Sequence, residues 1–168
     1  IPLGAATNQV MLAPRVQARM LQDLAVKKTD KVLDIGTGSG FMAALLAHQS
    51  SSVLSLEIDA NLAAQAQSNL QKAGVTNAVV RTADGSQGAP ADGPFDVIAL
   101  SGSVAEVPAA LLQQLAVGGR LVAIVGEEPM MRATLITRTS DNNWTTTEPW
   151  DCNAPRLSGF PEHSRFEF

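Results

Sequence analysis

The sequence predicts one three-layer α/β domain, built on a mostly parallel sheet that helices cover on both faces. Apolar runs of four to six residues alternate with helical patterns along most of the 168-residue chain. Strands that are apolar throughout are buried on both faces, which is typical of parallel sheets. After Gly126, two strand-like runs follow one another across a polar turn, "SDNN". Strands joined so tightly pair antiparallel, so we expect seven strands with an antiparallel one near the C-terminus.

The helices are predicted from the spacing of their apolar residues and from their end signals. The first begins at Ala13, has Pro14 where a first turn tolerates proline, and buries one apolar stripe, with Gln17 among the polar residues between. Asp59 can cap a later helix, which Gly74 closes. We expect strands at 31–35, 53–57, 78–81, 95–100, 120–125, 133–139 and 144–151, and helices at 13–24, 41–48, 60–73 and 108–115.

The composition limits the classes of function. The chain is 45% hydrophobic and 17% charged, the balance of a globular protein, and its net charge of −4 includes no basic block. We therefore expect no nucleic-acid partner. No apolar run approaches the roughly 18 residues of a membrane span, and the start lacks a secretory pattern, so no membrane association is expected. The single cysteine, Cys152, excludes an internal disulfide and fits a cytoplasmic protein.

A glycine-rich turn, "DIGTGSG", follows the first predicted strand. Gly36 and Gly38 allow backbone angles that other residues avoid and let a ligand approach the main chain. Gly40 opens the next helix, whose N-terminal amides favour a negative group. In open parallel sheets the ligand lies beyond the carboxyl ends of the strands, where this turn falls. A nicotinamide or flavin dinucleotide is one alternative, but its G-x-G-x-x-G fingerprint requires a glycine where Phe41 stands.

Acidic residues lie at the ends of the next two predicted strands. Glu57 ends the second strand, where a carboxylate can accept hydrogen bonds from both ribose hydroxyls of a nucleoside. Asp84 and Gly85 follow the third strand, where a side chain and the main chain can meet an adenine ring. Three loops at three neighbouring strand ends are thus predicted to surround one nucleoside.

The elements "VLDIGTGSG", "LEID", "ADGSQG", "PFDVIAL" and "VPAALLQQLAVGGRLVAIVG" resemble the protein-L-isoaspartate O-methyltransferases. These are class I S-adenosylmethionine-dependent enzymes with a Rossmann-like fold, which methylate the free carboxylate of isoaspartyl residues in damaged proteins and release S-adenosylhomocysteine. The resemblance covers about 13–126. It places the cofactor against Asp34, Gly36, Thr37, Gly38, Gly40, Glu57, Ile58, Asp84 and Gly85. The sequence has only two histidines and no cluster of metal-ligating residues, so no metal is expected.

We expect three segments within the single domain 1–168. Residues 1–30 lie on the substrate side, 31–126 form the cofactor-binding core, and 127–168 contain the C-terminal antiparallel strands. The segment "MLAPRVQARML" matches the family around its proline but has Leu12 where the family typically carries a serine close to the substrate carboxylate. Leucine cannot donate a hydrogen bond.

Leu12 and the tail "PWDCNAPRLSGF", a poor match to the usual ending of the family, predict a divergent member. A small-molecule acceptor, or a protein that binds the cofactor without catalysis, stays open beside isoaspartyl peptides and proteins. A carboxylate acceptor, with a reference pKa of about 4, is ionised at neutral pH and needs no general base. The substrate-side candidates are Ser101 and Ser103 after the fourth strand and Arg15 in the N-terminal segment.

Overall fold

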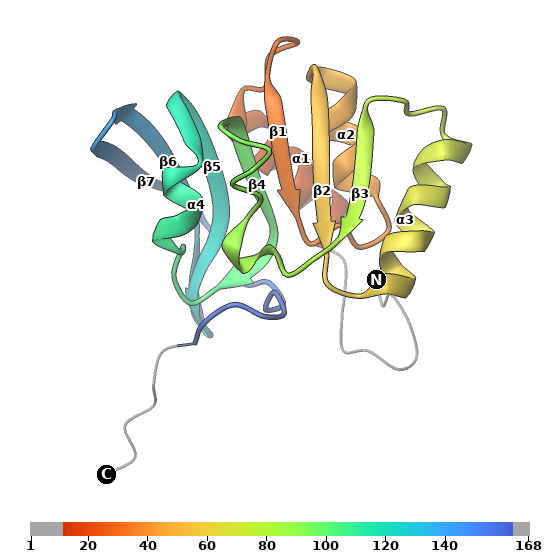
Figure 1. The fold of residues 1–168 in the computed structure, drawn as a ribbon. Coiled ribbons are helices and arrows are strands. Elements are labelled where there is room, and N and C mark those ends of the chain that lie inside the picture. Colours follow the sequence, from red (N-terminus) through yellow and green to blue (C-terminus); the bar gives the residue numbers. More distant parts are fainter. Residues whose placement is uncertain (1–11, 163–168) are drawn as a thin grey trace.

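The computed structural model describes residues 12–162 and contains one seven-stranded sheet, with the strand order β3-β2-β1-β4-β5-β6-β7 (Figure 1). Its helices are α1 (Pro14–Leu24), α2 (Phe41–Gln49), α3 (Ala60–Lys72), the 3₁₀ turn η1 (Gly85–Gln87) and α4 (Ala109–Gln113). Its strands are β1 (Lys31–Ile35), β2 (Ser52–Glu57), β3 (Ala78–Thr82), β4 (Phe95–Val104), β5 (Leu115–Glu127), β6 (Met130–Ser140) and β7 (Asn143–Asp151).

The strand directions confirm the predicted α/β fold. Strands β1 to β5 pair in parallel, whereas β6 runs antiparallel to β5, and β7 antiparallel to β6. Strand β6 is therefore the reversed strand of this sheet, at the position in the chain where the alternation of helices and strands stops. The strands β4 and β5 are longer than predicted, because their polar and glycine-containing ends also join the ladder.

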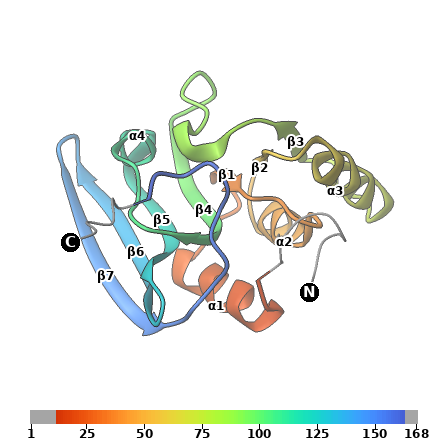
Figure 2. The same ribbon diagram turned by 90° about the horizontal axis from the view of Figure 1, so that it is seen from below.

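The sheet separates two apolar cores, one on each face. Along β1, Val32 faces one core and Leu33 the other, as the two-residue period of a strand requires. The first core lies under α1 and α2, and receives Leu70 from α3. The second lies under α4 and centres on the fully buried Phe95. Seen from below, α1 and α2 lie on one side of the strands and α4 on the other (Figure 2).

One helix differs from its predicted packing. In α1 the buried residues are Gln17, Met20 and Leu24, so the stripe that faces the sheet follows an i, i+3, i+7 pattern through Gln17. The expectation that Gln17 belongs to the polar side of this helix is wrong. The helical period places Gln17 on the same side of α1 as Met20 and Leu24, but its polar side chain suggested an exposed position.

The segment that follows β7, residues 152–162, crosses the ends of the central strands, and we call it the C-terminal strap (Figure 2). Ser103 at the end of β4 holds the strap by two main-chain hydrogen bonds. The N–H of Ser103 donates to the carbonyl of Pro155 at 2.7 Å, and the carbonyl of Ser103 accepts from the N–H of Leu157 at 2.8 Å. Among residues 12–162, no helix is long and apolar enough to cross a membrane. The predicted terminal segments extend to 1–11 and 163–168, which lie outside the described residues.

Candidate functional site

A pocket is lined by residues at the carboxyl ends of β1, β2 and β4. These strand ends form the lower edge of the sheet in Figure 1. The strands and their loops contribute 35–38, 56–58, Gly85, Ser101 and Gly102. The opposite wall consists of Leu12, Gln17 and the strap residues 155–158 and Phe160. Segments from both ends of the described chain therefore meet over the strand ends.

The glycine turn after β1 forms the floor of this pocket. Gly36, Gly38 and Gly40 have φ values of 86°, 56° and 88°, a region that disfavours side chains. A Cβ atom on Gly36 would also stand 2.6 Å from Cδ2 of Leu157 in the strap. Gly40 caps α2 and does not line the pocket; a Cβ atom there would approach the backbone oxygen of Ala66 at 3.2 Å. Gly40 thus lets α2 and α3 pack closely.

Glu57 at the end of β2 presents a buried carboxylate to the pocket. Its side chain is 5% exposed, and its two oxygens accept hydrogen bonds from the backbone N–H groups of Gly38 at 3.2 Å and Asp59 at 3.0 Å. A carboxylate has about four acceptor sites, so two remain for donors in the pocket. Ile58 follows it in the lining and is 42% exposed.

Asp34 lies beneath the glycine turn at the centre of a buried polar network. Its carboxylate accepts hydrogen bonds from the hydroxyls of Ser55 at 2.7 Å and Ser101 at 2.9 Å, and the Ser55 hydroxyl also contacts that of Thr37 in the turn. Burial raises the pKa of Asp34 from 3.8 to about 6, against the two serine hydrogen bonds, which lower it. The network joins the ends of β1, β2 and β4.

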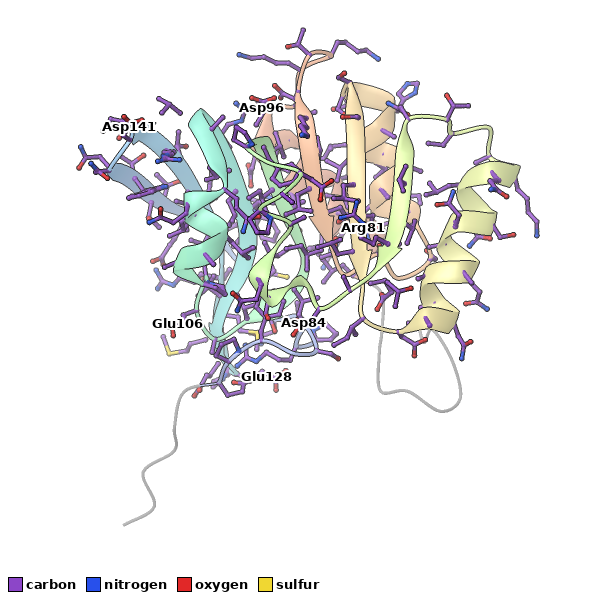
Figure 3. The ribbon with its side chains drawn as sticks, viewed as in Figure 1. Arg81, Asp84, Asp96, Glu106, Glu128 and Asp141 are labelled. Carbon is purple, nitrogen blue, oxygen red and sulfur yellow. The ribbon has the colours of Figure 1, made fainter. Side chains whose placement is uncertain are left out.

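Asp84 and Gly85 follow β3 at the same edge of the sheet. The Asp84 side chain caps η1 by accepting from the N–H of Ser86 at 2.9 Å, and Figure 3 shows it at the lower edge of the molecule. Gly85 lines the pocket, and a Cβ atom there would stand 2.3 Å from Cγ2 of Ile35. Only glycine therefore fits between η1 and the end of β1.

The three substrate-side candidates lie in different places. Ser101 lines the pocket and donates its hydroxyl to Asp34. Ser103 is fully buried, and its hydroxyl donates to the carbonyl of Ala154 at 2.8 Å, so it holds the strap and does not line the pocket. Arg15 is exposed on α1, also outside the pocket lining.

The pocket contains residues that the sequence did not single out. Gln17 from α1 is 2% exposed, and its side-chain oxygen Oε1 has no hydrogen-bond partner within the described part of the chain. The strap supplies Arg156, Leu157 and Phe160. A polar residue inside the apolar stripe of α1 is a signal that could have revealed Gln17, whereas the strap has no periodicity that reveals its course.

The residues at these strand ends fit an adenosyl cofactor. The positive φ angles of the glycine turn leave its main chain bare, and the two free acceptor sites of buried Glu57 match the two hydroxyls of a ribose. Between residues 12 and 162, no three His, Cys, Asp or Glu side chains gather as a metal site would require. Fold and site together define an S-adenosylmethionine-dependent methyltransferase of class I.

Comparison with known proteins identifies the family. The model of the protein-L-isoaspartate(D-aspartate) O-methyltransferase family matches residues 1–152, so the chain belongs to this family. Protein-L-isoaspartate O-methyltransferase 2 of Marinobacter nauticus is 46% identical over 95% of this chain and 72% of its own length. At that identity, the expectation of a divergent member is wrong.

Solved structures agree with the fold. A protein-L-isoaspartate O-methyltransferase is 26% identical with a TM-score of 0.79, and the match covers 87% of this chain and 47% of the other. A beta-aspartate methyltransferase of Plasmodium falciparum, in complex with S-adenosyl-L-homocysteine, has a TM-score of 0.78 at 22% identity, over 92% of this chain and 78% of its own. The chain thus spans between about half and three quarters of the length of these proteins.

Proposed function

We propose that the pocket binds S-adenosylmethionine and that this chain methylates the free carboxylate of L-isoaspartyl residues in proteins. The observation that carries the proposal is the meeting of a bare glycine turn and the buried Glu57 carboxylate in one pocket, at the carboxyl ends of β1 and β2. Membership of the isoaspartyl methyltransferase family supports the choice of acceptor.

Each group of cofactor-side residues would bind a different part of the ligand. Glu57 accepts from the ribose hydroxyls, with Ile58 against the nucleoside, and Asp84 with Gly85 lies on the adenine side. The main chain of the turn, at Gly36, Thr37 and Gly38, receives the methionine part. Asp34 acts from beneath, because Ser55 connects it to Thr37, and Gly40 acts by packing α2. When bound, the cofactor supplies a methyl group on a positively charged sulfur.

The acceptor side has to exclude water and hold the carboxylate in line with that methyl group. The carboxylate is ionised at neutral pH, so this chain need not remove a proton, and orientation alone can contribute on the order of 7–11 kcal/mol to lowering the barrier. Ser101 and Gly102 lie at the pocket wall beside the turn, and Leu157 covers it. These residues surround the place where the acceptor would enter.

The test compares methyl incorporation into an isoaspartyl peptide with incorporation into its aspartyl twin. We expect incorporation into the isoaspartyl peptide alone. In Glu57→Gln, which keeps the shape but loses one acceptor oxygen, we expect roughly tenfold weaker cofactor binding by calorimetry, because a hydrogen bond to a charged group is lost. Equal incorporation into the two peptides, or none into either, would refute the proposed acceptor.

The proposal extends to the organisation of the chain. Residues 1–30 serve the acceptor and 31–126 the cofactor, and within 127–168 the strands β6 and β7 complete the sheet and the strap covers the pocket. The proposed partners are proteins that contain isoaspartyl residues. We propose no nucleic-acid or membrane partner, because the net charge is −4 and the sequence has no basic block. A cytoplasmic location accords with the single cysteine, which cannot form an internal disulfide.

A further inference from the structure

A buried polar side chain faces the pocket without a partner. Gln17 is only 2% exposed, and it lies in the pocket lining together with Leu12, which is 4% exposed. Its Oε1 atom makes no hydrogen bond to any described residue. Leaving a buried acceptor unpaired costs about 1–3 kcal/mol, so a residue of this kind is expected where a ligand supplies the missing partner.

The position of Gln17 points to the acceptor as that ligand. It comes from α1, whereas Glu57 lines the pocket from the end of β2, and Asp84 follows β3 at the same sheet edge without lining the pocket. Its neighbour Leu12 is the other pocket residue from this segment, and a leucine side chain can make no hydrogen bond. Among the pocket residues from this N-terminal segment, the Gln17 amide is thus the group that can hydrogen-bond to a polar acceptor, and unlike Arg156 on the same wall, which already donates to Gly126 and Glu162, its Oε1 atom has no partner among the described residues.

We propose that Gln17 is the acceptor-recognising residue of the pocket, an inference that rests on the proposed function. An isoaspartyl residue carries its free carboxylate and its own peptide N–H on the same carbon atom. A glutamine amide offers one acceptor oxygen and an NH₂ donor side by side. Oε1 accepts from the peptide N–H, and the NH₂ group donates to the carboxylate oxygen that does not attack the methyl group. One side chain thereby binds and orients the acceptor.

The experiment measures kcat and KM for an isoaspartyl peptide, and the calorimetric Kd of S-adenosylmethionine, in wild type and Gln17→Leu. This variant removes the unpaired polar group, so we expect an unchanged or higher melting temperature. We expect kcat/KM for the peptide to fall roughly 10- to 100-fold, as one or two hydrogen bonds to the acceptor are lost, with a cofactor Kd within twofold. Gln22→Leu makes the same change on the exposed side of α1 and should leave all values unchanged.

A second variant tests the role of Gln17 by a recovery of activity. Leu12→Ser places a hydroxyl in the same pocket wall, and combined with Gln17→Leu it should recover part of kcat/KM, which repacking of α1 alone would not achieve. Wild-type kcat/KM in Gln17→Leu, or a loss of cofactor binding, would overturn the role of Gln17. Absence of isoaspartyl methylation in the wild type would overturn the proposed function itself, and this inference with it.

Discussion

Asp34 is a charged residue kept in a place where charge is unfavourable. It is fully buried, and two serine hydroxyls only partly replace the water that it loses. Its pKa is therefore about 6 instead of 3.8. The folded protein holds this proton more tightly than the unfolded chain, so between about pH 4 and pH 6 the free energy of unfolding falls as the pH rises, and above pH 6 the loss is complete.

We therefore predict that Asp34→Asn stabilises the protein at pH 8 and not at pH 4. The shift corresponds to about 3 kcal/mol, of which we expect roughly 1–3 kcal/mol to be recovered, because an amide can stay hydrogen-bonded to Ser55 and Ser101 when one hydroxyl turns to accept. Urea unfolding of both proteins from pH 4 to pH 8 measures the difference directly. A difference that does not change with pH would contradict the buried, shifted carboxyl.

At the scale of elements, the C-terminal strap forms part of the pocket wall. Ser103 makes four hydrogen bonds to it, because its N–H and carbonyl each make one and its hydroxyl both donates to Ala154 and accepts from the guanidinium of Arg156 at 3.5 Å. That guanidinium also donates to the carbonyl of Gly126 at 2.7 Å. Leu157 then lies against Gly36 and Gly102. Ala154 and Phe160 of the strap are buried in the two cores. Because the strap joins the sheet through an isolated bridge at Arg156 and not as a strand, its middle can open locally while the sheet beneath it stays folded.

We predict that Ser103→Ala loosens the strap selectively. The carbonyl of Ala154 loses its buried donor, at a cost of about 1–3 kcal/mol, so trypsin should cut after Arg156 several-fold faster while cleavage after Arg138 in β6 is unchanged. Ser140→Ala, in the hairpin between β6 and β7, is the matched control and should behave as wild type. Faster cleavage at both arginines would instead indicate that the whole domain is destabilised.

The sequence predicted the elements well but the pocket only in part. The bounds of β1 were predicted to the residue, because an apolar run before a glycine turn depends only on neighbours in the chain. The strap could not be predicted, since its pairing joins Ser103 to Leu157 across more than fifty residues and follows no period. Gln17 was misplaced because polarity normally marks the exposed side of a helix. Local signals thus located the strand-end side of the pocket, whereas long-range contacts place the strap on its other side.

For the whole molecule, the distribution of charge bears on which acceptors approach the pocket. The chain carries a net charge of −4. Figure 3 shows Asp84, Glu106 and Glu128 in the lower part of the molecule, on the side of the strand ends that line the pocket, and Asp141 at the upper left, away from them. The three carboxylates at the lower edge belong to exposed residues, so they act on a peptide through solvent and are screened by salt.

We predict that isoaspartyl peptides flanked by lysine have a lower KM than the same peptides flanked by glutamate. Exposed charge pairs contribute about 0.2–1 kcal/mol each, so the ratio of KM values should be roughly two- to fivefold at low salt. It should disappear in 0.5 M NaCl, where the screening length is only a few ångströms. The double variant E106Q/E128Q should lose most of the preference, whereas D141N, which removes one charge at the far edge, should keep it. A preference that survives high salt would mean that the flanking residues are recognised by direct contact and not by the field of this edge.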